Sequence, residues 1–456
     1  MTDGPVRSIR PAARLRTLAI RWLVELAGGL GAGSFARSVV VLAAAGAASQ
    51  VVVIAASPVV TRLYSPVDIG TLAVYTSLLS LLSVAVSLRF EQTIPMPTTD
   101  LEGRELLGVA LVANVALSGL TVVAVALVGS DVARLAQSPG LAGWLWLLPI
   151  SLSALGAFEA LSLWAVRTGA FSAMAGAKLG QNVGQVAAQV SLGLLGAGSA
   201  GLMVGDAVAR VGGCAALRQL LATRGALLTD VTLGGMRRAA RQYRRFATIS
   251  AASGLVNTAV ANLPPIILAT LYGPAVAGFF ALGRLVIFAP AEVISTSIGR
   301  VYFGRVTRAR NEAPGSLQGL LVRVATRLSL ALPAFALVFV ASPVVFPIVF
   351  GPDWAEVGVY AQILCPALAL SFVLQTTNML LPLGFAGYEL VWDLFRLAVA
   401  LGGVVAAHAL GADARTAVTA YAAGLAVSYA GLLGLNVFVL RRHFPREVTA
   451  ASGSGP

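Results

Sequence analysis

The chain has 456 residues, of which 57% are hydrophobic and 11% are charged, and its mean hydropathy is +0.85. Soluble domains carry about 25% charged residues, so this composition indicates a membrane protein. The formal net charge is +13, and Lys178 is the sole lysine. Because the arginines lie in short gaps between apolar runs, the charge indicates orientation in a membrane and argues against nucleic acid as a partner.

The first segment, residues 1–34, is basic, and we expect it to lie in the cytoplasm. Arg21 and Glu25 interrupt its apolar stretch, which argues against a cleaved signal peptide. Residues 14–27 could form a helix on the membrane surface, and a disordered segment is an equally good interpretation.

Twelve apolar segments follow, each near or above the ~20 residues that cross a bilayer as a helix. We therefore predict an all-α polytopic membrane protein with two six-helix bundles, at residues 35–221 and 247–440. A basic cytoplasmic linker (222–246) separates them, and a cytoplasmic tail (441–456) follows. The predicted spans are residues 36–60, 67–88, 106–129, 142–166, 171–195, 200–217, 247–271, 275–298, 328–350, 355–380, 386–409 and 416–440.

Arginine counts predict the orientation of these spans. With the N-terminus inside, the inner segments hold 25 arginines and the outer loops hold three, Arg62, Arg134 and Arg415. Cytoplasmic loops are enriched in Lys and Arg, so both termini are expected in the cytoplasm of a multi-pass plasma membrane protein.

The second half of the chain repeats the beginning of the first. At an ungapped offset of 208 residues, eight positions are identical, with the kernel Leu-Tyr-x-Pro-x-x-x-Gly-x-x-Ala at residues 63–73 and 271–281. Each bundle has an even number of spans, so the two have the same orientation. This predicts a pseudo-twofold axis along the membrane normal and a central cavity between the bundles.

Several chemistries have no motif in this sequence. The lysine context Gly176-Ala177-Lys178-Leu179 is not a nucleotide-binding P-loop, and no Asp-x-Asp, His-Glu-x-x-His or Gly-x-Ser-x-Gly pattern occurs. Two cysteines within apolar runs and two distant histidines favour neither a disulfide scaffold nor a metal site. We expect no cofactor and no enzyme, and transport would have to run without ATP.

Leaving aside residues at the edges of spans, such as Asp68 and Glu356, nine ionisable residues fall within the predicted spans. Each would cost ~3 kcal/mol if it faced lipid, so together they must face one another or water. On the fifth span, Lys178, Asn182, Gln185 and Gln189 share one helix face. The nine are Glu159, Lys178, Asp206, Arg210, Arg284, Glu292, Glu389, Asp393 and Arg396.

Structural roles compete with binding roles for these residues. Arg284 and Arg396 have no carboxylate four residues away in their spans, which favours binding, although Asp393 lies three residues from Arg396. The amide face of the fifth span could serve interhelical hydrogen bonds. The residues that could form structural ion pairs instead are Glu159 with Lys178, and Asp206 with Arg210.

A cavity lined by cations and amides suits an amphiphile with an anionic link and many hydroxyls. Arginine binds phosphate oxygens through paired N–H groups, and amides hydrogen-bond sugars. An acyl tail can remain in the lipid.

Three segments carry a family resemblance. Residues 61–70 (TRLYSPVDIG), 88–95 (LRFEQTIP) and 297–303 (SIGRVYF) resemble the polysaccharide transporter family of Wzx-type oligosaccharide flippases. That family belongs to the superfamily of MATE exporters and lipid II flippases. The resemblance extends over residues 34–442.

This resemblance implies a flippase that moves an undecaprenyl-pyrophosphate-linked oligosaccharide from the inner to the outer leaflet of the bacterial inner membrane. It also implies alternating access coupled to a proton or cation gradient, with a polysaccharide polymerase as a partner. Arg89 and Glu91 match the family motif, or form a salt-bridged helix end. The candidate ion-coupling residues are Glu159, Asp206, Glu292 and Asp393. The candidate substrate-binding residues are Lys178, Arg210, Arg284, Arg396, Arg89, Asn182, Gln185 and Gln189.

Two other functions stay open. A MATE-like cation-coupled drug antiporter would need an acidic cavity for cationic drugs, and the spans contain five carboxylates and four cations. A membrane glycan polymerase or ligase would need a large outer loop, whereas the longest outer segment is about residues 130–140.

Overall fold

The structure is a computed structural model that describes residues 34–86, 88–225 and 227–444. Within these ranges the secondary structure is helical and no strand occurs. The surface helix expected over residues 14–27 lies outside the described residues, as does the tail beyond residue 444.

Each of the twelve predicted spans corresponds to a long helix, which confirms the predicted fold class. The first six helices form one lobe, the N-lobe, and the rest form the C-lobe. The N-lobe helices are α2 (Ser34–Leu63), α3 (Pro66–Val86), α4 (Asp100–Leu135), α5 (Leu147–Arg167), α6 (Phe171–Leu194) and α7 (Gly198–Ala222). The C-lobe helices are α8 (Leu233–Tyr272), α9 (Pro274–Glu312), α10 (Leu317–Ser329), α11 (Leu332–Phe350), α12 (Ala355–Leu374), α13 (Ala386–Ala409) and α14 (Ala414–His443).

Eleven candidate membrane spans are long and apolar enough to cross a bilayer among the described residues. Helix α6 is not one of them, because Lys178 and four amide side chains lower its hydropathy. Its closest neighbours are α7 and α2. The polar face of this span is therefore tolerated by packing inside a lobe.

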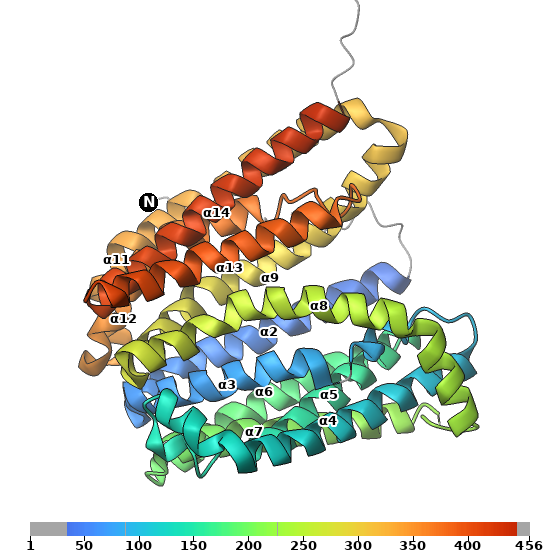
Figure 1. Cartoon of the computed structure of the whole chain (residues 1–456), viewed down its shortest axis with the longest axis horizontal. Helices are drawn as coiled ribbons and strands as arrows, with labels where there is room; N and C mark the ends of the chain where they lie inside the picture. The colour runs from blue at the N-terminus through green and yellow to red at the C-terminus, as the bar shows by residue number, and fades with distance from the viewer. Residues whose placement is uncertain (1–33, 87, 226, 445–456) are drawn as a thin grey trace, which may run out of the picture.

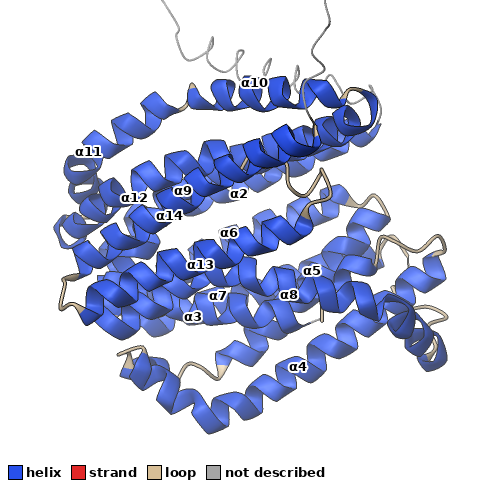
Figure 2. Ribbon diagram, turned by 45° about the horizontal axis from the view of Figure 1, so that its top comes forward, coloured by secondary structure: helices blue, strands red, loops and turns tan. Residues whose placement is uncertain are grey.

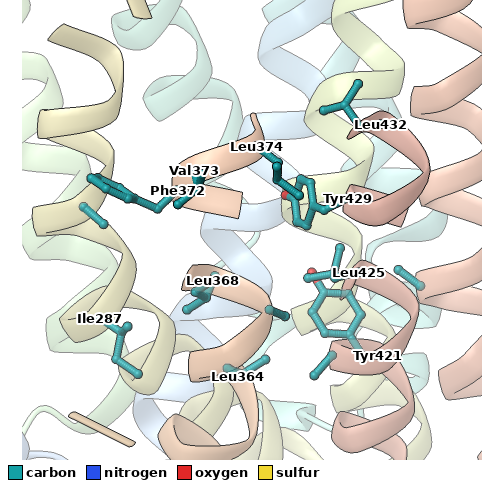
Figure 3. Close-up of a cluster of buried hydrophobic side chains, with 14 of the residues drawn as sticks. Ile287, Leu364, Leu368, Phe372, Val373, Leu374, Tyr421, Leu425, Tyr429 and Leu432 are labelled. Atoms are coloured by element: carbon teal, nitrogen blue, oxygen red, sulfur yellow. The ribbon is translucent and has the colours of Figure 1, made fainter. Parts of the chain in front are cut away.

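The C-lobe is organised around α12. Figure 3 shows α12 between α9 and α14, with Leu364, Leu368 and Phe372 of α12 in a buried apolar cluster that also contains Tyr421 and Leu425 of α14. This packing supports α9 from behind, and α9 is one of the C-lobe helices that line the space between the lobes.

The two lobes approach each other at one end of the molecule and diverge toward the other (Figure 1). They are closest at the end that contains the α2–α3 and α8–α9 turns, here called the hairpin end. The opposite end, where α7 connects to α8 and α9 to α10, carries most of the arginines and is here called the arginine-rich end.

The repeated glycines meet at the hairpin end. A Cβ on Gly70 would lie 1.7 Å from the carbonyl oxygen of Pro274, and a Cβ on Gly278 would lie 2.2 Å from that of Pro66. The helices α3 and α9 make the most extensive contact between the lobes. The repeat kernel is thus the place where the pseudo-twofold-related halves cross, because glycine lets the two backbones touch.

Two hydrogen bonds between the lobes repeat the same symmetry. The indole N–H of Trp354, in the loop between α11 and α12, donates to the Thr61 carbonyl near the end of α2 (2.9 Å). The Gln137 amide, in the loop between α4 and α5, donates to the Thr270 carbonyl near the end of α8 (2.8 Å). Carbonyls in a last helical turn have no partner within the helix, so each lobe caps the first helix of the other.

Replacing Trp354 by phenylalanine should loosen the hairpin end. The ring remains, but the bond to the Thr61 carbonyl is lost, at ~1 kcal/mol of unfolding free energy. We expect wider separation of the lobes in spin-label distance measurements across this end. Trp392→Phe is the control, since the Trp392 indole donates to the Ser428 carbonyl within the C-lobe (2.7 Å). An equal change in lobe separation in both variants would contradict the role of Trp354.

The predicted linker is largely helical. Helix α7 ends at Ala222 and α8 begins at Leu233, where the Thr232 side chain caps the helix by accepting from the Gly235 N–H (3.0 Å). The start of α8 packs against α4 of the N-lobe, where Gly235 lies against the Glu105 carboxylate. Helix α8 therefore connects the lobes in two ways: it follows α7 in the chain, and its first turns pack against α4 at the arginine-rich end.

Candidate functional site

A cavity of about 390 Å³ lies between the lobes and is here called the interlobe cavity. Its walls come from α2, α3, α6 and α7 of the N-lobe and from α8 and α9 of the C-lobe. Much of the lining is aliphatic. The polar residues among those that line it include Gln50, Gln185, Gln189, Asn262, Arg284 and Glu292.

Arg284 on α9 is positioned in this cavity by a backbone hydrogen bond that α8 lacks. In an unbroken helix the Ala261 carbonyl would accept from the N–H of residue 265, but that residue is proline and has none. The Arg284 guanidinium donates to this free carbonyl instead (2.6 Å) and lies 5.4 Å from the Phe288 ring centroid. Among the described residues no ion pair involves Arg284.

Glu292 lies two turns after Arg284 on α9 and is exposed. It also lines a second space of about 320 Å³, the C-lobe cavity, together with Ser295, Gln375 and Glu389. The two cavities share Phe288 and Glu292, so a polar path extends along α9 from the interlobe cavity toward the arginine-rich end.

Two of the three predicted amides line the interlobe cavity. Gln189 is buried, and its amide donates to the Leu202 carbonyl on α7 (3.1 Å). Gln185 is half-buried and contacts Asp206 at 3.4 Å. Asn182 instead donates to the Ser49 carbonyl on α2 (3.4 Å) and does not line the cavity. The amide face therefore combines interhelical bonding with cavity lining.

Asp206 and Arg210 form a buried ion pair inside the N-lobe. Two guanidinium nitrogens of Arg210 contact the two Asp206 carboxylate oxygens at 2.7 and 3.0 Å, and Asp206 is 1% exposed. The sequence left open a structural ion pair or a binding role for these two residues, and this geometry agrees with the ion pair.

Lys178 and Glu159 do not form the ion pair that was one interpretation of their spacing. Lys178 is exposed, and its ammonium lies 5.7 Å from the centroid of the Phe158 ring. Glu159 on α5 lies within electrostatic range of Lys178, Arg210, Arg89 and Glu91. These charges form a cluster in the N-lobe, adjacent to but outside the lining of the interlobe cavity.

Arg396 is enclosed in the C-lobe and does not line either cavity. It is 3% exposed, pairs with Asp393 at 2.8 Å and contacts Asn257 at 3.3 Å. Its guanidinium also lies 4.5 Å from the Trp392 ring centroid. In this conformation Arg396 is paired with Asp393, although its buried Nε has no hydrogen-bond partner among the described residues. Of the predicted span arginines, Arg284 is the one that lines the interlobe cavity.

Arg89 occupies a turn between α3 and the short 3₁₀ helix η1 (Phe90–Thr93). Its backbone is left-handed (φ 59°), as is that of Leu88 (φ 49°), a conformation unfavourable for residues with a Cβ. The guanidinium packs against Gly254 of α8, where a Cβ would lie 2.1 Å from Nη2. Glu91 is buried beside it. Arg89 thus contacts the other lobe at the arginine-rich end.

Sequence reasoning missed Gln50 and Asn262, which line the interlobe cavity from α2 and α8. Both are uncharged, so the search for ionisable residues within the spans did not single them out, although Gln50 shares helical spacing with Ser57 and Asn262 with Thr258. In the part of the chain that the structure describes, no three His, Cys, Asp or Glu side chains gather as a metal site would require.

Two related lobes, each with six of the predicted spans, around a cavity between them define the fold of two-lobed membrane transporters. Solved structures with this fold include a multidrug resistance MATE family transporter of the MOP superfamily in an inward-facing conformation (15% identity, TM-score 0.61, covering 86% of this chain and 94% of that one). The lipid II flippase MurJ in an inward closed conformation is also similar, with 10% identity and a TM-score of 0.70, over 87% of this chain and 87% of that one. The MATE transporter VcmN of Vibrio cholerae is similar as well, with 13% identity and a TM-score of 0.58, over 92% of this chain and 98% of that one.

A family model described as polysaccharide biosynthesis protein matches residues 59–358. The chain belongs to this family, which confirms the prediction made from its motifs. No curated protein matches the sequence.

Proposed function

We propose that this protein is a flippase that moves an oligosaccharide linked to undecaprenyl pyrophosphate from the inner to the outer leaflet of a bacterial inner membrane. The observation that carries the proposal is Arg284, a cation without a carboxylate partner in the interlobe cavity, with the amides Gln185 and Gln189 in the same lining. A guanidinium suits a diphosphate, and amides suit sugar hydroxyls. The family description, polysaccharide biosynthesis, supports a glycan substrate.

Flipping by this route is alternating access without ATP and without covalent chemistry. In the conformation described here the Gly70–Gly278 contact closes the hairpin end, and the lobes would rock so that this contact separates and the interlobe cavity opens to each side in turn. Of the four candidate coupling carboxylates, we propose Glu292, because it is exposed and lines both cavities. Protonation there would change the charge of the polar path beside the diphosphate.

The proposed orientation places both termini and the arginine-rich end in the cytoplasm, as the positive-inside rule requires. The substrate would then be made at the arginine-rich end and released at the hairpin end. A polysaccharide polymerase acting on the outer side is the partner that such a product implies.

The test is flipping of a pyrophosphate-linked oligosaccharide by the reconstituted full chain. We expect Arg284→Ala to reduce the rate at least about 10-fold, because a lost charge-assisted hydrogen bond is worth ~1.5–3 kcal/mol, while Arg284→Lys keeps part of it. Arg134→Ala is the control, since Arg134 is exposed at the hairpin end and pairs with Asp131. Wild-type flipping by a folded Arg284→Ala protein would contradict the proposal.

A MATE-like drug antiporter is the second candidate, favoured by the exposed Glu292 carboxylate and by the similarity in fold. Arg284 in the same cavity would repel cationic drugs. Efflux of such drugs that depends on Glu292 and improves in Arg284→Ala would support the antiporter instead of the flippase.

A further inference from the structure

A third cavity, of about 310 Å³, lies between α9, α10 and the start of α11, and is here called the α9–α10 cavity. It shares no lining residue with the interlobe cavity or the C-lobe cavity. Most of its wall is apolar, with Ile294, Ile298 and Val301 from α9 and Val324 and Leu328 from α10. The proposed transport path does not pass through it.

Two arginines also line the α9–α10 cavity. Arg305 on α9 and Arg327 on α10 are both exposed, and neither forms an ion pair or a side-chain hydrogen bond within the described ranges. Tyr302 lines the same cavity and is 3% exposed, and its hydroxyl has no hydrogen-bond partner there. Buried hydroxyls are normally paired, so this wall lacks a polar group that a ligand would supply.

Helix α10 has the composition of a helix at a membrane surface. Its leucines at 317, 321 and 328 are buried on one face, whereas Arg323 and Arg327 are exposed. By length and hydropathy, α10 and α11 together form one candidate membrane span, Pro314–Phe350, so α10 is the arginine-bearing end of that span. Figure 2 shows α10 as an outer helix of the C-lobe, continuing through a bend into α11. Arginines at the end of a span lie near the headgroups, so the α9–α10 cavity would open close to them.

We propose that the α9–α10 cavity binds one anionic phospholipid of the leaflet at the arginine-rich end. An acyl chain would occupy the aliphatic wall, and Arg305 and Arg327 would hold the phosphate, since unpaired guanidinium groups complement an anionic headgroup. We do not assign this cavity to the lipid carrier of the transported glycan. Arg284, which is proposed to hold the diphosphate of that carrier, lines the interlobe cavity and not the α9–α10 cavity. The bound lipid would fix α10 against α9, and with it the start of the α11 span.

The test uses the purified full chain, freed of co-purified lipid and titrated with phosphatidylglycerol or with phosphatidylcholine of the same acyl chains. Bound lipid is counted by native mass spectrometry. We expect wild type to retain one phosphatidylglycerol in preference to phosphatidylcholine. In the double variant R305Q/R327Q this binding should weaken roughly 30-fold, at about five-fold for each basic residue that faces an anionic lipid.

The matched control is R300Q/R323Q. It removes one exposed arginine from each of the same two helices, and neither of these arginines lines the cavity. It should bind phosphatidylglycerol as wild type does. A second variant, Ala331→Phe, fills the cavity while keeping both arginines, and it should also lose the lipid. Equal losses in the two double variants would show diffuse charge attraction and overturn the proposal. Retention of undecaprenyl phosphate in place of phosphatidylglycerol would overturn the assigned occupant.

Discussion

Replacing Gly278 by alanine should separate the lobes at the hairpin end. The new Cβ would lie 2.2 Å from the Pro66 carbonyl oxygen, and the corresponding change at Gly70 would place a Cβ 1.7 Å from that of Pro274. Both clashing atoms belong to backbone, so no side-chain rotation can relieve the overlap, and the helices α3 and α9 must move apart. Overpacking of this kind costs ~1–3 kcal/mol of unfolding free energy.

Distance measurements between spin labels would detect this movement. Leu195 and Leu410, in the loops that end α6 and α13, are exposed in opposite lobes and can carry the labels once Cys214 and Cys365 are replaced. We expect the label distance to lengthen in Gly278→Ala and in Gly70→Ala, and flipping to fall sharply, because the closed hairpin end could no longer form.

The control is Gly304→Ala, on the same helix as Gly278 but with no atom within 4 Å of its new Cβ. That change should leave the label distance unchanged and stabilise α9 by up to ~1 kcal/mol, as alanine favours helix over glycine. An unchanged label distance in both Gly278→Ala and Gly70→Ala would refute the role of this contact in closing the hairpin end.

The sequence predicted the helices well because bilayer crossing imposes a single length on apolar segments. Even α6, whose amides and lysine lower its hydropathy, is predicted as a span from its length and its small number of charges. The internal repeat predicted the two lobes. It did not reveal that its own glycine, at 70 and 278, forms their contact, because spacing along one chain does not show which halves cross.

The candidate site was predicted less completely, for a physical reason. Periodicity shows which residues share a helix face but not which neighbour covers that face. Arg284 and Arg396 were both candidate binding residues in sequence, with Asp393 three residues away weakening the case for Arg396. In the structure Arg284 lines a cavity beside Pro265 of α8, whereas Arg396 is enclosed by Asp393 and Trp392. Distinguishing them required the positions of α8 and α13 relative to α9, which are tertiary information.

Removing one member of the buried Asp206–Arg210 pair should be among the most destabilising changes in the N-lobe. Asp206→Ala would leave the Arg210 guanidinium, whose side chain is 18% exposed, without its carboxylate; breaking a fully buried pair costs ~3–5 kcal/mol, which is the upper bound here. The exposed Asp131–Arg134 pair is the control, for which Asp131→Ala should cost no more than ~1 kcal/mol. Thermal unfolding in detergent can be followed through reaction of a thiol dye with the buried Cys365.

The double variant Asp206→Leu/Arg210→Met separates a structural role from ion coupling. Apolar residues of similar volume often replace a buried ion pair without loss of stability, so we expect this protein to unfold close to the wild-type temperature. Because both Asp206 oxygens are engaged by Arg210, we also expect it to keep gradient-driven flipping, whereas Glu292→Gln should lose it. A stable double variant that flips without any dependence on the gradient would identify Asp206, and not Glu292, as the coupling carboxylate.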